Sequence, residues 1–185
     1  MKQLNSHLFE DVYKKLGIDL DELGCIMLDV EPIKPMLKEK DLYFTQDKKK
    51  FWINGWVASK TPHITLLYGL LESGKNYEKY IEAVLKDWKM DSVEVNHVGY
   101  FDSPYQDEAY YCIVAHLKIT KELLEGHQRL EFLPHINTFT GYLAHFTIAY
   151  IRKNENLRDG LISKLNTSLV GKKLNIKNIN LEDKK

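Results

Sequence analysis

The sequence predicts an α+β fold of two pseudo-symmetric lobes, with antiparallel-rich sheets lining a central cleft and helices outside. Three observations predict it: strand-like apolar runs alternate with segments of helical periodicity, one order of elements occurs twice, and each copy contains a strand with the pattern His-x-Thr. Such a repeat indicates a duplicated unit. We expect a single domain over residues 1–185, with lobes at about 24–101 and 109–181 after an N-terminal helical segment, 1–23.

The elements of the first unit follow from periodicity and from stop signals. Apolar residues at helical spacing predict a short helix over Leu8–Leu16, which Gly17 can end. GCIMLDV, residues 24–30, reads as a strand that ends before a proline. The remaining elements are a charged excursion (36–50), a strand or hairpin arm (51–57), the first His-x-Thr strand, a helix from the N-cap Asn76 to the core residue Trp88, and a strand (92–101).

The second unit repeats this order. Thr120 is a good N-cap for a helix that Pro134 must end, and Asn154 is a good N-cap for another. In the helix after Asn154 leucines step by four residues, and Gly171 can end it. The expected strands of this unit are 109–119, 145–151 and 172–181.

Composition and charge restrict the class of function. The 26 basic residues balance the 26 acidic ones, so no net field attracts a long polyanion, and a small phosphorylated ligand fits better than a nucleic-acid duplex. No apolar run reaches a membrane span and no secretory signal is evident, so we expect a cytoplasmic protein. Cys25 and Cys112 are expected to be reduced, buried thiols.

Two short strands carry the residues of chemical interest. The first reads TPHITLLYG over 61–69 and the second AHFTIAYI over 144–151. Side chains alternate along a strand, so each His is expected to share a face with the Thr two residues later. The residues expected on the opposite face are Ile64, Leu66 and Tyr68 in the first strand, and Phe146, Ile148 and Tyr150 in the second.

This combination suits a phosphodiester. One imidazole, of His63 or His145, can remove a proton from the attacking hydroxyl while the other protonates the departing oxygen, since imidazole takes either role near neutrality. The hydroxyls of Thr65 and Thr147 can donate hydrogen bonds to the non-bridging phosphate oxygens. One motif alone is as well explained by an ordinary half-exposed strand, but two at matching places in a repeat favour a site. Which imidazole is base and which is acid stays open.

The other histidines argue against a protein metal site. They show neither a His-x-x-x-His pair nor a neighbouring Cys pair, so no metal and no cofactor is expected.

PHITL and AHFTI, whose histidines stand 82 residues apart (145 minus 63), resemble the signature of the two-histidine phosphoesterase superfamily. This resemblance implies a bilobal fold with a pseudo-twofold axis and metal-independent catalysis at phosphodiesters of nucleotides. The residues that match its motif are His63, Thr65, His145 and Thr147.

A narrower resemblance concerns LGCIMLDVEPI (23–33) followed by PHITLLYGLL (62–71), which is similar to the anti-CBASS phosphodiesterases of bacteriophages. It implies hydrolysis of 3′-5′ linkages in cyclic di- and trinucleotide messengers, a block on bacterial CBASS signalling, and the cytoplasm of an infected bacterium. The ribose 2′-hydroxyl would be the internal nucleophile. The charged 36–50 stretch looks longer than in compact members, which leaves the role of the 36–57 excursion open.

Four further residues are candidates for binding such a substrate. Tyr13 and Tyr105 are aromatic where periodicity does not require burial, and base stacking is worth about 1 to 3 kcal/mol. Lys60 precedes the first motif and Arg152 follows the second, so each could contact phosphate. An ordinary surface role explains each of the four as well.

Two other functions fit the same pattern. An enzyme that opens 2′,3′-cyclic phosphates on RNA ends would use the same residues, and a nucleotide sponge would bind without cleaving. The balanced charge argues weakly against the first, and two intact motifs argue against the second. Base preference, ring size, oligomeric state, and phage or cellular origin stay open.

Overall fold

The computed structural model describes residues 13, 15–18, 23–33, 62–103, 110–137 and 141–182. Within them the fold class is the predicted α+β, with six strands in one sheet in which every neighbouring pair is antiparallel. In chain order the elements are β1 (Gly24–Val30), β2 (His63–Leu70), the 3₁₀ turn η3 (Gly74–Tyr77), α2 (Glu78–Leu85), β3 (Ser92–Asp102), β4 (Tyr110–Leu117), α3 (Lys121–Leu130), β5 (His145–Arg152), α4 (Glu155–Leu169) and β6 (Lys173–Glu182).

The order of the strands in the sheet has the internal symmetry expected of a duplicated unit. It runs β2-β1-β6-β3-β4-β5, and exchanging β1 with β4, β2 with β5 and β3 with β6 gives the same order read backwards. β6 therefore pairs with β1 of the first unit, and β3 pairs with β4 of the second. Each sequence unit contributes its last strand to the other half of the sheet.

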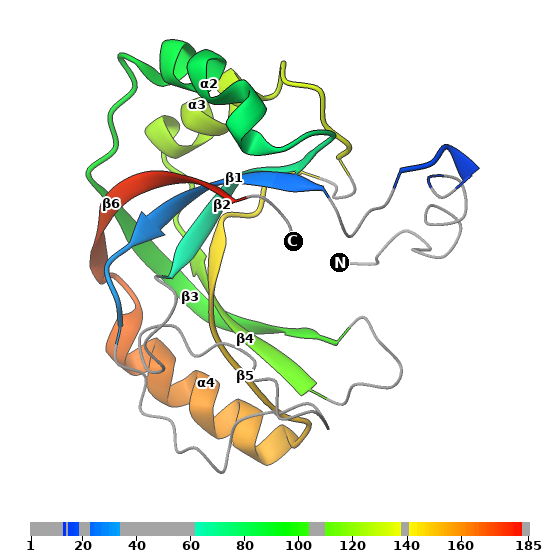
Figure 1. Cartoon of the computed structure of the whole chain (residues 1–185). Helices are drawn as coiled ribbons and strands as arrows, with labels where there is room; N and C mark the ends of the chain where they lie inside the picture. The colour runs from blue at the N-terminus through cyan, green and yellow to red at the C-terminus, as the bar shows by residue number, and fades with distance from the viewer. Residues whose placement is uncertain are drawn as a thin grey trace.

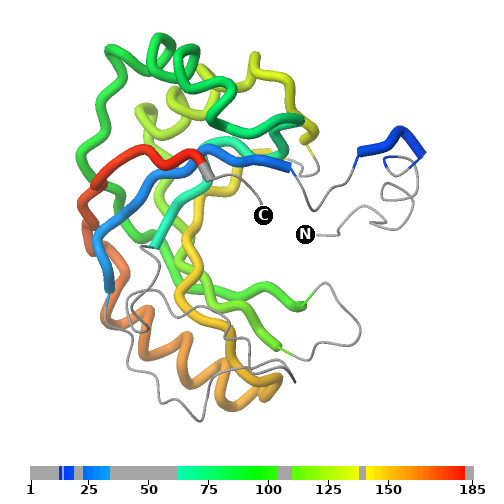
Figure 2. The backbone as a smooth tube through the Cα atoms, viewed as in Figure 1, coloured from blue at the N-terminus to red at the C-terminus, as the bar shows by residue number. Residues whose placement is uncertain are grey.

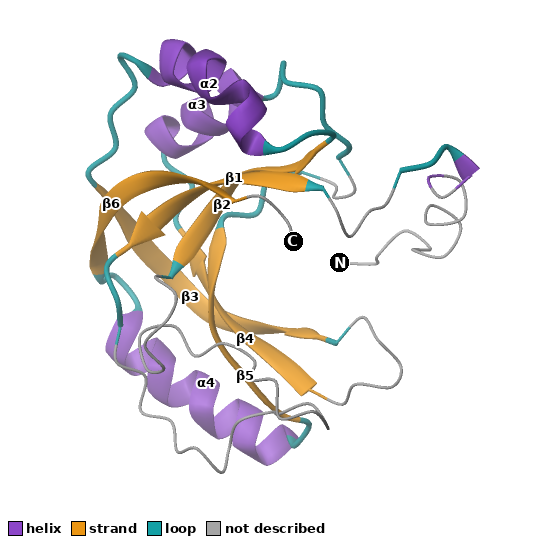
Figure 3. Ribbon diagram, viewed as in Figure 1, coloured by secondary structure: helices purple, strands orange, loops and turns teal. Residues whose placement is uncertain are grey.

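The sheet consists of a first half-sheet, β2-β1-β6, and a second half-sheet, β3-β4-β5. They are joined where β3 meets β6, through pairs such as Val93 with Leu174. Figure 1 shows α2 and α3 on the outer side of the first half-sheet and α4 on the outer side of the second, and Figure 3 shows the same arrangement by element type. We call the face turned away from these helices the inner face.

The main apolar core fills the helical side of the sheet. Alternate residues of β1, among them Ile26 and Leu28, are fully buried there, as are Ile113 of β4 and Phe146 of β5. Burial of this kind is the dominant stabilising contribution in a domain of this size. A separate small cluster around Cys112 lies on the inner face.

Side-chain caps fix two of the three helices α2, α3 and α4 of the described ranges as the sequence predicts. The Thr120 hydroxyl accepts from Leu123 N at 3.2 Å, and the Asn154 side chain accepts from Leu157 N at 2.9 Å. The predicted cap at Asn76 is wrong, because a 3₁₀ turn precedes α2 and Ser73 caps that turn by accepting from Lys75 N.

Several predictions lie outside the described residues. These are the excursion at 36–50, the strand or hairpin arm at 51–57, Lys60, Tyr105 and most of the Leu8–Leu16 helix. Over the part of the chain that is described, no helix combines the length and apolar character needed to cross a membrane.

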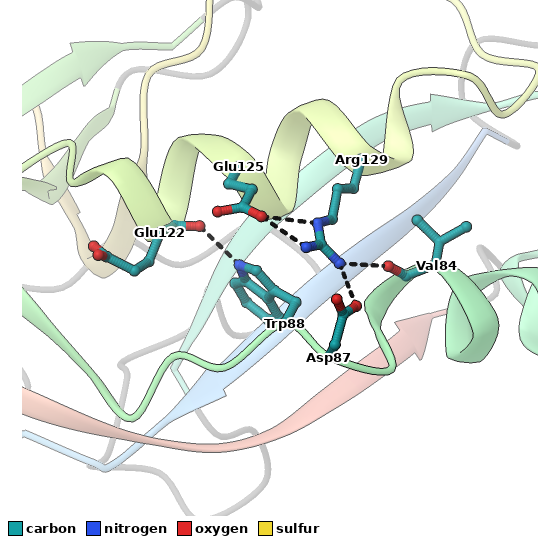
Figure 4. Close-up of polar contacts among 6 residues, drawn as sticks. All are labelled: Val84, Asp87, Trp88, Glu122, Glu125 and Arg129. Carbon is teal, nitrogen blue, oxygen red and sulfur yellow. Dashed lines mark hydrogen bonds and ion pairs between the residues drawn. The ribbon is translucent and has the colours of Figure 1, made fainter.

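Two helices of the first half-sheet are joined by a polar contact that involves Trp88. Its indole N–H donates to the carbonyl oxygen of Glu122 at 2.8 Å (Figure 4). Its ring lies next to Gly126 of α3. Beside it, Arg129 bonds Glu125 and Asp87 at 2.7 Å each. Trp88 is half-buried against the core, so its predicted core assignment is correct in part.

Gly126→Ala is expected to destabilise the protein by about 1 to 3 kcal/mol. The added Cβ would come within 2.6 Å of the Trp88 ring, which its hydrogen bond holds in place. Gly160→Ala is the matched control, because a Cβ there meets no atom within 4 Å. Replacing a glycine by alanine inside a helix stabilises the helix by up to about 1 kcal/mol. Urea unfolding measures both changes, and a stabilised Gly126→Ala protein would contradict the contact.

Candidate active site

The fold brings the two motif strands together although they stand at opposite ends of the strand order. β2 and β5 pack against each other, and Figure 2 shows their traces side by side. His63, Thr65, His145 and Thr147 are all half-buried, and they alternate with fully buried core residues. Since the core lies on the helical side, the four motif side chains lie on the inner face.

A β-bulge in each motif strand changes the face of the residues that follow. The adjacent β1 residues Ile26 and Met27 pair with Leu67 and Thr65 of β2. β2 therefore has one extra residue, Leu66, between these two pairs. β5 has the same irregularity, because Ile113 and Val114 of β4 pair with Ala149 and Thr147, which leaves Ile148 as the extra residue. One extra residue inverts the alternation.

The expected orientation of the two tyrosines is therefore wrong. After the bulge Tyr150 returns to the inner face, where it packs with the Cys112 cluster and its ring lies 5.2 Å from that of Tyr110. Tyr68 pairs with Cys25 in the equivalent position of β2. The repeated pattern is thus His-x-Thr-x-x-Tyr, with all three side chains of each motif on the inner face.

A hydrogen bond from the segment before β5 ties the two motifs together. Tyr142, three residues before His145, donates its hydroxyl to the carbonyl oxygen of Thr65 at 3.1 Å. Its ring stacks on His127 of α3 at 4.1 Å, and Nδ1 of His127 donates to the carbonyl oxygen of Leu66 at 2.6 Å. The two rings satisfy consecutive carbonyls at the β2 bulge, and they fix where β5 begins relative to β2.

Tyr142→Phe is expected to lower the rate of any reaction that needs both motifs by roughly fivefold, because one neutral hydrogen bond is worth about 1 kcal/mol. The stacking on His127 survives, so the melting temperature should fall by only about 2 to 4 °C. Tyr80→Phe, at an exposed position of α2, is the control. An unchanged rate in Tyr142→Phe would show that the tie does not set the spacing of the motifs.

The geometry of His145 defines its reactive nitrogen. Nδ1 lies 2.8 Å from the carbonyl oxygen of Leu143, which can only accept, so Nδ1 carries a proton. In the neutral ring Nε2 is then the basic nitrogen. Burial lowers the pKa of His145, and the hydrogen bond to Leu143 opposes this in part.

Three histidines form a row across the second half-sheet. His145 of β5 pairs with His116 of β4, and His116 pairs with His97 of β3. The rings of His97 and His116 stack at 4.4 Å, those of His116 and His145 lie 6.3 Å apart, and Phe101 contacts both His116 and His145 edge-on. Gly99 leaves room for the His116 ring, because a Cβ there would lie 3.1 Å from its Nε2.

His116 is held in the neutral state. It is 9% exposed, and among the described residues its Nδ1 is the one buried side-chain nitrogen or oxygen without a hydrogen-bond partner. Burial first, and then the neighbouring His97 and His145, lower the pKa of His116 to about 4. A protonated ring at this position would bury an unpaired N–H donor.

His116 is therefore expected to make the protein sensitive to acid. Its folded-state pKa lies below the unfolded value of about 6.5, so the unfolded chain binds more protons and stability falls as pH drops from about 6.5 towards 4. In His116→Leu, the decrease in the free energy of unfolding between neutral and acidic pH should be smaller by on the order of 2 kcal/mol. Urea unfolding at pH 7.5 and 4.5 measures it, with His135→Leu as control, and an equal loss in His116→Leu and the unmodified protein would refute the assignment.

In the first half-sheet, the positions equivalent to this row of histidines hold different residue types. Asp29 of β1 pairs with His63 and, on its other side, with Asn178 of β6. Asp29 is 8% exposed, and its two carboxylate oxygens accept from Asn178 at 2.7 Å and from Asn180 at 3.3 Å. The pseudo-symmetric counterpart of the pair Asp29 and His63 is thus His116 and His145.

The hydroxyl of Thr147 belongs to a small polar cluster. It lies 3.7 Å from Sγ of Cys112, and the Tyr150 hydroxyl also bonds to these two side chains. Burial raises the pKa of Cys112 to about 11, so the thiol keeps its proton and can donate it to the threonine oxygen. The proton of Thr147 is then available to an anion on the inner face. Neither Cys25 nor Cys112 forms a disulfide, as predicted, but the predicted burial is correct only for Cys112, because Cys25 is half-buried.

The predicted substrate-binding residues are less well defined. Arg152 is exposed at the far end of β5, five residues beyond Thr147, which is about 15 Å along a strand. Tyr13 is half-buried in a short described stretch before β1, and Lys60 and Tyr105 lie outside the described residues. Nowhere in the described ranges do three or more His, Cys, Asp or Glu side chains come together as a metal-binding group would.

Sequence reasoning missed Asp29, His116 and the two tyrosines. The signal was present, because the first strands of the two units read CIMLD and CIVAH, and aligning them matches cysteine with cysteine and Asp29 with His116. Aligning HITLLY with HFTIAY likewise matches Tyr68 with Tyr150. No match between the two sequence units points to Tyr142.

Together, fold and site define a duplicated α+β protein with one His-x-Thr strand in each half-sheet. This is the arrangement that the resemblance to two-histidine phosphoesterases implies for the fold. No family model matches the chain, and no curated protein matches it.

Solved structures of Usb1 from Kluyveromyces marxianus are similar to the chain. One has 11% sequence identity and a TM-score of 0.49, and covers 89% of this chain and 95% of that chain. Another, of the same protein with uridine monophosphate, has 10% identity and a TM-score of 0.43, and covers 80% of this chain and 85% of that one.

Proposed function

We propose that the protein is a phosphodiesterase that uses two histidines, acts without a metal ion and cleaves 3′-5′ linkages of cyclic di- and trinucleotides. The observation that carries this proposal is the pair of equivalent His-x-Thr strands, packed together with both motifs on the inner face. Two imidazoles supply a base and an acid, and two hydroxyls supply donors for the phosphate oxygens. These groups are sufficient for the reaction.

The reaction begins with the ribose 2′-hydroxyl. One motif histidine removes its proton, the oxygen attacks phosphorus, and a new P–O2′ bond forms as the P–O5′ bond breaks. The other histidine gives its proton to the departing O5′, which leaves a 2′,3′-cyclic phosphate and a free 5′-hydroxyl. Thr65 and Thr147 donate to the non-bridging oxygens, where negative charge develops.

A small cyclic substrate fits the chain better than a long polymer. The net charge is zero, so no broad positive field is available to bind a polyanion. On the inner face, Phe101 is 37% exposed and its ring lies 5.1 Å from that of His145, so an aromatic surface for a base adjoins a motif histidine. In an infected bacterium this activity would destroy CBASS messengers, and the protein would act in the bacterial cytoplasm.

The test is incubation of the purified protein with cyclic di- and trinucleotides and with an RNA bearing a 2′,3′-cyclic phosphate, in EDTA. Chromatography separates the products, and the His145→Ala protein is run in parallel. Cleavage of the cyclic nucleotides that is lost in His145→Ala supports the proposal. Cleavage of the RNA end alone would reassign the enzyme to RNA ends, and tight binding without any product would make it a sponge.

A further inference from the structure

We propose, resting on the proposed function, that Asp29 and His116 are positioning residues that set opposite protonation states on the two motif histidines. His63, beside the carboxylate, enters the reaction as the proton donor, and His145, beside a neutral buried imidazole, enters as the proton acceptor. The two positions are equivalent in the duplicated sheet, so the difference between them breaks the symmetry of the site.

Asp29 places a carboxylate beside His63. Residues paired directly across antiparallel strands have Cβ atoms about 5 Å apart, which puts the Asp29 carboxylate within the range where an opposite charge favours a protonated imidazole. The carboxylate is fixed in place, because Asn178 and Asn180 donate to its two oxygens. Little water reaches it to screen the interaction, since Asp29 is almost fully buried.

The surroundings of His145 contain an imidazole in the place of that carboxylate. Its cross-strand neighbour His116 is a neutral imidazole near neutral pH, so His145 lacks the carboxylate that His63 has in the equivalent place. The edge of Phe101 covers another side of the ring at 5.1 Å. His145 is thus favoured as a neutral base, with Nδ1 protonated towards Leu143 and Nε2 free to accept.

Other charged groups on the inner face lie at positions that are not paired with a motif histidine. The titratable side chains on this face include His97, stacked on the far side of His116, and the cysteine and tyrosine pairs further along the strands. Where the half-sheets join, they also include Glu94, which pairs with Lys173 and lies 3.6 Å from Lys118, and Glu31, which accepts from Asn175. The thiol of Cys112 stays protonated, and so does the hydroxyl of Tyr150, because burial raises the pKa of each. Asp29 is the carboxylate that pairs directly across the strands with a motif histidine.

These two roles account for both proton transfers of the reaction. Nε2 of His145 takes the proton of the 2′-hydroxyl as the P–O2′ bond forms, and His63 delivers its proton to O5′ as the P–O5′ bond breaks. After one cycle His145 is protonated and His63 is neutral, and exchange with solvent restores both.

The first test needs no activity. Histidine side chains labelled with ¹⁵N are titrated by NMR in the free protein, and His63→Gln and His145→Gln assign the signals. We expect His63 to lose its proton at higher pH than His145, and Asp29→Asn to lower the midpoint of His63 by about one pH unit. Asp91→Asn, the same charge change on an exposed loop, should leave it unchanged. Equal midpoints, or an unshifted His63 in Asp29→Asn, would overturn the inference.

The second test uses the dependence of kcat/KM on pH, with the cyclic dinucleotide that the unmodified protein cleaves. The rising limb follows deprotonation of the base and the falling limb follows deprotonation of the acid. Asp29→Asn should move the falling limb about one unit lower, and His116→Asp should move the rising limb higher. A shift of the opposite limb in either variant would refute the roles. If no substrate is cleaved, the proposed function fails while the NMR order of titration still decides the inference.

Discussion

Replacing either motif histidine by alanine is expected to lower cyclic dinucleotide cleavage by about 10²- to 10⁴-fold, because each supplies one of two proton transfers. His63→Ala and His145→Ala should both fold, since the two side chains are half-buried on the inner face and lie outside the main core. The measurement is the single-turnover rate at saturating substrate, which isolates the chemical step from binding.

The pair of variants also distinguishes the two roles. A base that is lost can be replaced in part by hydroxide as pH rises, so His145→Ala should recover activity at high pH, whereas His63→Ala should not. His135→Ala is the matched control, because its imidazole donates within its own turn to Leu133 at 2.7 Å. Full activity in either motif variant would refute a mechanism with two histidines.

Most of the fold could be predicted from local sequence signals. Caps such as Thr120 and Asn154 act within three residues, and apolar periodicity reports which face of an element is buried, so element order follows from short-range physics. The repeated order also indicated that both His-x-Thr strands would serve one site. The structure agrees in packing β2 against β5.

The register of the sheet could not be predicted in the same way. The bulges that return Tyr68 and Tyr150 to the inner face depend on how β2 and β5 pair with β1 and β4, and a strict period of two gives the wrong face. The exchange of β3 and β6 between the half-sheets also arises from long-range pairing. Aligning the two units shows that Asp29 and His116 are equivalent, but the pairing of each with a motif histidine depends on this register.

Thr65→Val and Thr147→Val are each expected to lower kcat by about 10²- to 10³-fold, with a smaller change in KM. Valine keeps the volume and branching of threonine and removes only the hydroxyl that donates to the phosphate. Charge on the non-bridging oxygens grows as the reaction proceeds, so the missing donor affects the transition state more than the bound substrate. Steady-state kinetics with a cyclic dinucleotide separates kcat from KM.

Thr147 should respond to its neighbours as well as to its own replacement. The Cys112 thiol can donate to the threonine oxygen, which directs the hydroxyl proton outward. Cys112→Ala should therefore lower kcat in the protein that has Thr147 and change it little in Thr147→Val, since the group that it orients is then absent. Thr167→Val, which removes an exposed hydroxyl on α4, is the control. Equal effects of Cys112→Ala in both backgrounds would mean that the thiol acts through packing and not by orienting the donor.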